Sequence, residues 1–115
     1  MTAPDKKQDQ VSSGKDKKGR KAKKREDAEK RSLIRATLKP IQDKLIMLEE
    51  RIADLEKRGK ELEKILSDPD IFADKDKNLS FLNEYREVRE KLKELMGRWE
   101  FAQDQLETAK RDLGI

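Results

Sequence analysis

The sequence predicts an all-α protein, a two-helix antiparallel coiled-coil hairpin preceded by a disordered basic N-terminal arm. Three observations support this prediction. The 115-residue chain is 47% charged and only 33% hydrophobic, whereas a globular domain is typically about 45–50% apolar and about 25% charged. Two heptad repeats of equal length follow each other along the chain, and the cations are concentrated near its start.

The predicted arm covers residues 1–25. Val11 is its only large apolar residue after Met1, and eight of the eleven residues 15–25 are Lys or Arg. Such a stretch cannot bury enough apolar surface to offset its ordering entropy. Good helix formers follow, so we expect a short helical lead-in over residues 26–39.

Two heptad seams predict a hairpin over residues 40–115, with a connection at about residues 67–79. Seam residues recur in alternating steps of four and three, as the a and d positions of a coiled coil require. The first seam is Ile34, Leu38, Ile41, Leu45, Leu48, Ile52, Leu55, Gly59, Leu62 and Leu66. The second seam is Phe81, Tyr85, Val88, Leu92, Leu95, Trp99, Ala102, Leu106, Ala109 and Leu113.

Equal seams with a short connection favour two helices of one chain packed antiparallel. Leu48 then meets Trp99, and Gly59 lies opposite Val88. A parallel homodimer is the competing arrangement. The hairpin is favoured because it avoids the translational entropy cost of dimerisation, so we expect the isolated domain to be a monomer.

The connection contains residues that end and start helices. Pro69 cannot continue the first helix, because it has no N–H and clashes with the preceding turn. Ser67 or Asp68 is expected to cap a short turn that begins at Pro69. Asn78 or Ser80 is expected to cap the second helix.

Three residues do not fit the seams. Ile71 and Phe72 are the large apolar residues of the connection, and we expect both to fold back over the end of the hairpin. Pro40 lies inside the first seam, where it frees the carbonyl of Ala36. It predicts a kink or a fresh helix start, with the preceding residues as a separate short helix.

The composition argues against catalysis. The chain has no Cys and no His, so it has no thiolate nucleophile, no zinc-thiolate site and no imidazole base. Its glycines are isolated and form no phosphate-binding loop. No apolar run is long enough to span a membrane, and no signal peptide is apparent. We expect a cytoplasmic protein that binds rather than catalyses, without catalytic residues, a bound cofactor, a metal or a membrane partner.

The basic part of the arm is the first candidate nucleic-acid site. Net charge is +6 over residues 1–32 and −2 over residues 33–115. Clustered cations suit phosphate backbones through Coulomb attraction and counterion release, with almost no sequence reading. A solubilising linker and a nuclear-localisation signal remain alternatives. The candidate residues are Lys15, Lys17, Lys18, Arg20, Lys21, Lys23, Lys24 and Arg25.

One edge of the predicted hairpin is the second candidate. In an antiparallel pair, g positions face g positions and e positions face e positions. Glu56 and Arg89 form an attractive pair on the e side, whereas cations face each other on the g side. The resulting basic stripe contains Lys44, Arg51, Arg58, Lys91 and Arg98.

This basic stripe has an alternative interpretation, which is neutralisation within each helix. Acidic residues lie three positions after three of its cations; they are Asp54, Glu61 and Glu94. Among the aromatic residues, Trp99 and Tyr85 occupy a positions and are expected in the core. Phe101 lies off the seam and is the more exposed candidate for stacking on bases. The remaining carboxylates are expected to form a solvated surface.

Several motifs resemble the C-terminal coiled-coil domain of ABC-F ATPases, a group that includes the Uup-like proteins. They are a proline in the first helix (Pro40), the L-E-x-x-I-x-x-L-E pattern at 48–56, an Asp-Pro turn with an apolar pair at 68–72, and Arg-Trp-Glu at 98–100. The resemblance covers about residues 33–112. It implies a parent protein with two ATPase domains that bind ATP and Mg²⁺, with residues 1–32 as the basic linker that follows them.

The resemblance also implies a function. ABC-F proteins act on ribosomes or nucleic acid, and DNA binding is associated with the Uup-like branch. We therefore expect a domain that binds DNA or structured RNA without sequence specificity. The alternatives are a protein-interaction or spacer hairpin that positions the ATPase domains, and a helical arm that grips tRNA.

Overall fold

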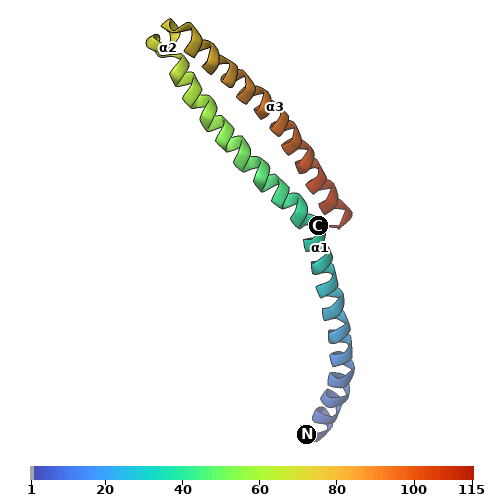
Figure 1. Cartoon of the computed structure of the whole chain (residues 1–115). Helices are drawn as coiled ribbons and strands as arrows, with labels where there is room; N and C mark the ends of the chain where they lie inside the picture. The colour runs from blue at the N-terminus through green and yellow to red at the C-terminus, as the bar shows by residue number, and fades with distance from the viewer. Residues whose placement is uncertain (1) are drawn as a thin grey trace. The chain divides into compact units, whose positions relative to one another are not determined.

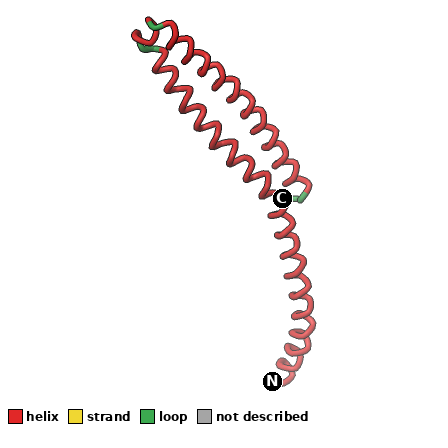
Figure 2. Tube along the Cα trace, in the orientation of Figure 1, coloured by secondary structure: helices red, strands yellow, loops and turns green. Residues whose placement is uncertain are grey.

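The computed structural model describes the backbone of residues 2–115 and the side chains from residue 19 onward. This part of the chain forms three helices, α1 (Thr2–Leu66), α2 (Pro69–Ala73) and α3 (Lys75–Asp112), and contains no strand (Figure 1, Figure 2). The chain divides into two compact units, Met1–Thr37 and Leu38–Ile115. In the second unit the end of α1 and α3 lie side by side and antiparallel (Figure 1). The predicted all-α hairpin is confirmed.

The core of the hairpin is the predicted pair of seams. Every seam residue in the second unit is buried or half-buried. Leu62 and Leu95 are the largest fully buried side chains, and the other buried apolar residues are Leu38, Leu45, Leu48, Val88 and Ala102. Trp99 packs against this core. A Cβ added to Gly59 would lie 3.8 Å from Val88 Cγ1, so the register that places these two residues opposite each other is confirmed.

Two aspartates cap the helices of the connection. The Asp68 carboxylate accepts a hydrogen bond from the Asp70 N–H at 3.0 Å and caps α2, as predicted. Asp74 has an extended backbone and accepts from the Lys77 N–H at 3.2 Å, so it caps α3. The prediction of Asn78 or Ser80 was wrong, because Asp74 is an equally good cap placed one turn earlier and α3 continues through both.

The tip of the hairpin leaves an aromatic side chain in solvent. Ile71 is half-buried, but 72% of Phe72 is exposed. The expectation that both residues fold back over the hairpin was therefore wrong for Phe72. These neighbours lie in the single turn of α2, where successive side chains point about 100° apart. A turn this short cannot direct both side chains toward the hairpin.

α1 continues through Pro40 without a break, so the predicted fresh helix start at this proline was wrong, whereas the alternative, a kink, stays a prediction. Proline in a helix interior removes one hydrogen bond and costs about 3 kcal/mol. Seam residues on both sides of Pro40 offset this cost. Leu38 is buried, and Ile41 packs against the hairpin core.

Disorder of residues 1–25 stays a prediction, although α1 begins at Thr2 in the structure. Intrinsic propensity favours a helix over the last part of this stretch. Residues 19–33 consist mainly of Lys, Arg, Glu and Ala, which rank among the best helix formers. All fifteen of these residues are exposed, so their helical conformation owes nothing to packing.

Candidate nucleic-acid interface

The first candidate surface is the basic segment, residues 15–25. Its first three cations, Lys15, Lys17 and Lys18, have side chains outside the described part of the chain. The other five are exposed, and none of them belongs to an ion pair within residues 19–115. They are Arg20, Lys21, Lys23, Lys24 and Arg25.

The helical conformation arranges these five cations on one broad side of α1. At about 100° per residue they span an arc of about 200°. Glu26 and Glu29 fall on the remaining arc, whereas Asp27 falls on the basic side. A helix thus concentrates positive charge on one face, which the sequence-based expectation of a disordered arm did not include.

The second candidate surface is the basic edge, defined by Lys44, Arg51, Arg58, Lys91 and Arg98. Three of the five N–H donors of Arg58 are engaged by carboxylates. Its Nε and Nη2 donate to Glu84 at 2.7 and 3.0 Å, and its Nη1 donates to Glu61 at 3.2 Å. These hydrogen bonds raise the pKa of Arg58, and the bond from Arg58 lowers the pKa of Glu84. Arg58 therefore joins the two helices and has little capacity left for phosphate.

Glu94 compensates two further cations of the basic edge. It accepts from Lys91 Nζ at 3.4 Å and from Arg98 Nη2 at 2.7 Å. Neutralisation within each helix, the alternative interpretation, is thus confirmed for the pairs formed by Glu61 and Glu94. The corresponding Arg51–Asp54 pair is not among the ion pairs of residues 19–115.

Two members of the basic edge therefore remain uncompensated. Lys44 and Arg51 are exposed and belong to no ion pair in the part of the chain with described side chains. They lie seven residues apart on α1, about 10.5 Å at 1.5 Å per residue. The basic edge is thus a weaker anion-binding surface than its five cations suggest.

Sequence reasoning missed the contacts that cross the hairpin diagonally. It paired Arg58 only with Lys91, the g position directly opposite, but a long guanidinium also reaches the next g position, Glu84. The expected Glu56–Arg89 pair is not among the ion pairs of residues 19–115. Arg89 instead donates to the Tyr85 hydroxyl at 3.1 Å and lies 5.7 Å from the centroid of its ring.

The aromatic residues lie as predicted. Tyr85 and Trp99 are half-buried on the seam, and their polar atoms donate to carboxylates of α1. Phe101 is 60% exposed. Over the described residues, no group of three or more potential metal ligands is present and no helix is long and apolar enough to cross a membrane.

These features define an all-α helical hairpin with charged surfaces and a narrow apolar core. The family model "ABC transporter C-terminal domain" matches residues 41–104, which is more than half of the chain. The chain therefore belongs to the ABC transporter C-terminal domain family, consistent with the C-terminal domain of an ABC-F type ATPase. Comparison with curated proteins and comparison with solved structures each found no match.

Proposed function

We propose that this domain binds nucleic acid through the phosphate backbone, without sequence specificity, as the C-terminal domain of an ABC-F ATPase. The observation that carries the proposal is the row of exposed cations at residues 20–25, which form no ion pair within residues 19–115. DNA is the favoured ligand, because the motifs resemble the Uup-like branch, and structured RNA of the ribosome is the competing ligand. ATP and Mg²⁺ bind to the ATPase domains of the parent protein.

The proposed binding mode is electrostatic. A cationic helix face releases condensed counterions from the nucleic acid, so the logarithm of the association constant falls with the logarithm of salt concentration. The slope is about −0.9 per phosphate neutralised on duplex DNA. Lys44 and Arg51 add a smaller contribution from the basic edge, because the three other cations of that edge are held by carboxylates.

The test is a titration of fluorescently labelled duplex DNA and of a structured RNA at about 50 mM and about 200 mM salt. One variant replaces Arg20, Lys21, Lys23, Lys24 and Arg25 by Gln. A matched control replaces five exposed lysines elsewhere, Lys39, Lys57, Lys64, Lys75 and Lys77. The first variant is expected to lose affinity and to reduce the salt slope by up to about 4–5, whereas the control loses much less.

Two results would contradict the proposal. One is the absence of binding to either nucleic acid at the lower salt concentration. The other is equal loss in the two variants, which would mean that only net charge matters. Binding that is insensitive to salt would instead favour the alternative function, a protein-interaction or spacer hairpin.

A second variant measures how much the basic edge contributes to nucleic-acid affinity. Arg51→Glu combined with Arg98→Glu reverses one uncompensated cation and one shared cation on facing helices. A smaller loss of affinity than in the five-residue variant is expected. Unchanged affinity would assign binding to the basic segment alone and remove the basic edge from the site.

A further inference from the structure

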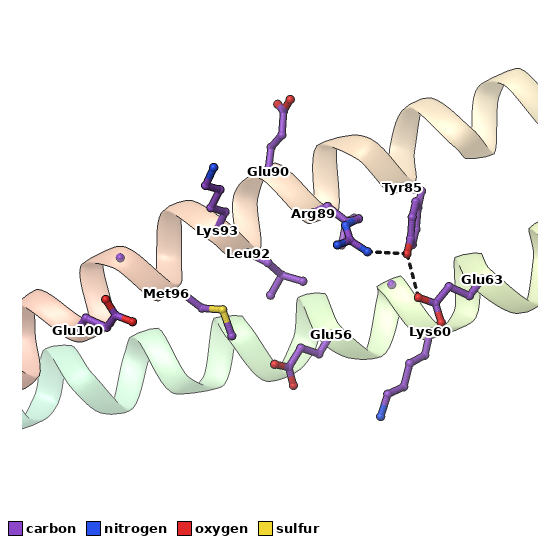
Figure 3. Close-up of a pocket in the computed structure, with 13 residues that line it drawn as sticks. Glu56, Lys60, Glu63, Tyr85, Arg89, Glu90, Leu92, Lys93, Met96 and Glu100 are labelled. Carbon is purple, nitrogen blue, oxygen red and sulfur yellow. Dashed lines mark hydrogen bonds between the residues drawn. The ribbon is translucent and has the colours of Figure 1, made fainter.

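A groove follows the e-position side of the hairpin, across the seam from the basic edge. It lies between α1 and α3 and has a volume of about 840 Å³ (Figure 3). Val88 and Leu92 form part of its apolar floor, and Met96 is 48% exposed beside them. Figure 3 shows Leu92 and Met96 pointing from α3 toward α1.

Small residues create this groove. Gly59 leaves the seam without a side chain opposite Val88, and Gly97 has no heavy atom within 4 Å of the place where its Cβ would be. A second, apolar hollow of about 290 Å³ shares Glu56 and Met96 with the groove and extends to Trp99. We call these two adjoining hollows together the carboxylate groove.

The α1 side of the carboxylate groove bears a regular row of acids. Glu49, Glu56 and Glu63 occupy successive e positions, about 10.5 Å apart on the helix. Trp99 Nε1 donates to Glu49 at 3.1 Å. The Tyr85 hydroxyl donates to Glu63 at 2.9 Å, as Figure 3 shows. These bonds orient the two outer carboxylates, and each carboxylate keeps acceptor sites for further donors.

The middle carboxylate is available to a partner. Glu56 has no side-chain hydrogen bond or ion pair within residues 19–115. Arg89, the cation expected opposite it, is held against the Tyr85 ring instead, and its bond to the Tyr85 hydroxyl raises the pKa of Arg89. Lys60 of α1 and Lys93 of α3 also line the groove, but neither is ion-paired with Glu56 within residues 19–115.

We infer that the carboxylate groove is a docking site for a basic amphipathic helix of a partner protein. Seven residues of a helix rise by about 10.5 Å, so Lys or Arg at seven-residue spacing would match the row of carboxylates. Apolar residues on the adjoining face would cover Met96 and the space beside Gly59. This is recognition of a helix in a groove, and it completes a three-helix arrangement.

Acidic residues outnumber cations by five to three along the two hollows, so charge complementarity and the apolar floor together favour this occupant. The basic segment of a second copy has the right charge, but Ala22 is its only apolar residue between positions 15 and 25. It cannot fill an apolar floor. A partner helix needs both features, which the chain's own basic segment lacks. The inference does not depend on nucleic-acid binding, because it uses the other side of the hairpin.

The test uses the full chain and a synthetic helical peptide of about three heptads, with Leu at a and d and Lys at e and g and no aromatic residue. Trp99 is the single tryptophan of the protein and lies at the end of the groove, so its fluorescence reports occupancy. A saturable change in emission is expected. A peptide of the same composition with scrambled order is expected to bind at least about tenfold more weakly, because it presents no apolar face.

Variants locate the binding site. Glu56→Lys and Gly97→Leu are each expected to weaken binding at least about tenfold, which corresponds to about 1.4 kcal/mol. Glu50→Lys is the matched control, since Glu50 is exposed on the α1 surface away from the groove. Circular dichroism and thermal melting establish that each variant is folded, and Gly97→Leu tests the groove without changing charge.

Four results would overturn the inference. They are the absence of a fluorescence change, equal binding of the scrambled peptide, equal loss in Glu50→Lys and Glu56→Lys, and self-association of the wild type that Gly97→Leu abolishes. The last result, measured by sedimentation equilibrium, would assign the groove to a second copy of this chain. Failure of the nucleic-acid titrations leaves the inference standing.

Discussion

Two stretches of α1, residues 19–33 and residues 34–66, are both rich in charged residues but differ in burial. Ten of the fifteen residues 19–33 are charged, and all fifteen are exposed. Fifteen of the thirty-three residues 34–66 are charged, yet that stretch buries or half-buries a seam residue at every step of three or four. The difference is the placement of the apolar residues. Helix propensity alone accounts for the first stretch, whereas the second is held by its packing against α3.

This comparison separates two sources of helical stability. Isolated helices in water are marginal, and most helical stability in proteins comes from the packing of an apolar face. Leu62 and Leu95 are almost completely buried between α1 and α3. The hairpin should therefore unfold cooperatively, while the exposed stretch loses its helical structure gradually as temperature rises.

The largest expected effect is the loss of a buried leucine. Leu62→Ala should destabilise the hairpin by about 2–5 kcal/mol, because it removes a fully buried side chain and leaves a cavity. Leu33→Ala is the matched control; Leu33 is 59% exposed, and its loss should change stability by no more than about 0.5 kcal/mol. Urea unfolding followed by Trp99 fluorescence measures both. Similar losses would mean that the exposed stretch also packs.

The seams were predictable because a period of 3.5 residues determines which side chains lie on the same face of a helix. Every seam residue assigned from spacing to the second unit is buried or half-buried. The exposure of Phe72 was not predictable in this way, because a helix of a single turn is too short to show a periodic pattern of apolar residues. Helix starts were also ambiguous, since Asp74, Asn78 and Ser80 all have side chains that cap.

The next largest effect tests the helix start that the structure assigns to Asp74. Asp74→Ala should cost about 0.5–2 kcal/mol, because the Lys77 N–H loses its acceptor. Asn at this position should retain most of the stability, since it caps nearly as well. Asp27→Ala, in the exposed stretch, should leave the unfolding midpoint of the hairpin unchanged. An Asn78→Ala variant with a larger loss than Asp74→Ala would restore the original prediction.

Glycine substitutions test the difference between the hairpin and the exposed stretch through an expected gain of stability instead of a loss. Gly59→Ala should stabilise the hairpin by about 0.4–1 kcal/mol, because alanine restricts the unfolded chain and favours helix. Its Cβ would lie 3.8 Å from Val88 Cγ1, an ordinary van der Waals contact. Gly19→Ala should raise the helical signal in circular dichroism without moving the midpoint of hairpin unfolding. Destabilisation by Gly59→Ala would show that Val88 leaves no room for a methyl group.

The sequence predicted which residues make up the candidate site, but not their conformation or the contacts that they form. The cations of the basic segment are visible in the sequence, but their display on one side of a helix depends on a helical conformation that the low apolar content of residues 1–25 did not predict. On the basic edge, spacing predicted which cations face each other. It did not identify Glu84 as the partner of Arg58. A long arginine side chain can reach several neighbours across the hairpin, and only the local geometry determines which of them it contacts.

The smallest expected effect concerns this pair of Arg58 and Glu84, which crosses the hairpin. Hydrogen bonding from Arg58 holds the pKa of Glu84 below the ordinary value of a glutamate side chain. A carboxylate with a lowered pKa stabilises the folded state above its unfolded pKa, and this contribution disappears as pH falls through the folded value. Glu84→Gln should therefore lower the melting temperature slightly at neutral pH and have no effect at about pH 2.

Exposure keeps the effect of this pair small. The side chains of Arg58 and Glu84 are each 39% exposed, so solvent screens their attraction. Glu87→Gln is the control, because Glu87 is exposed and belongs to no ion pair within residues 19–115. Melting temperatures of wild type and both variants at neutral and acidic pH test the assignment. A difference between wild type and Glu84→Gln that persists in acid would mean that packing of the side chain, rather than its charge, contributes the stability.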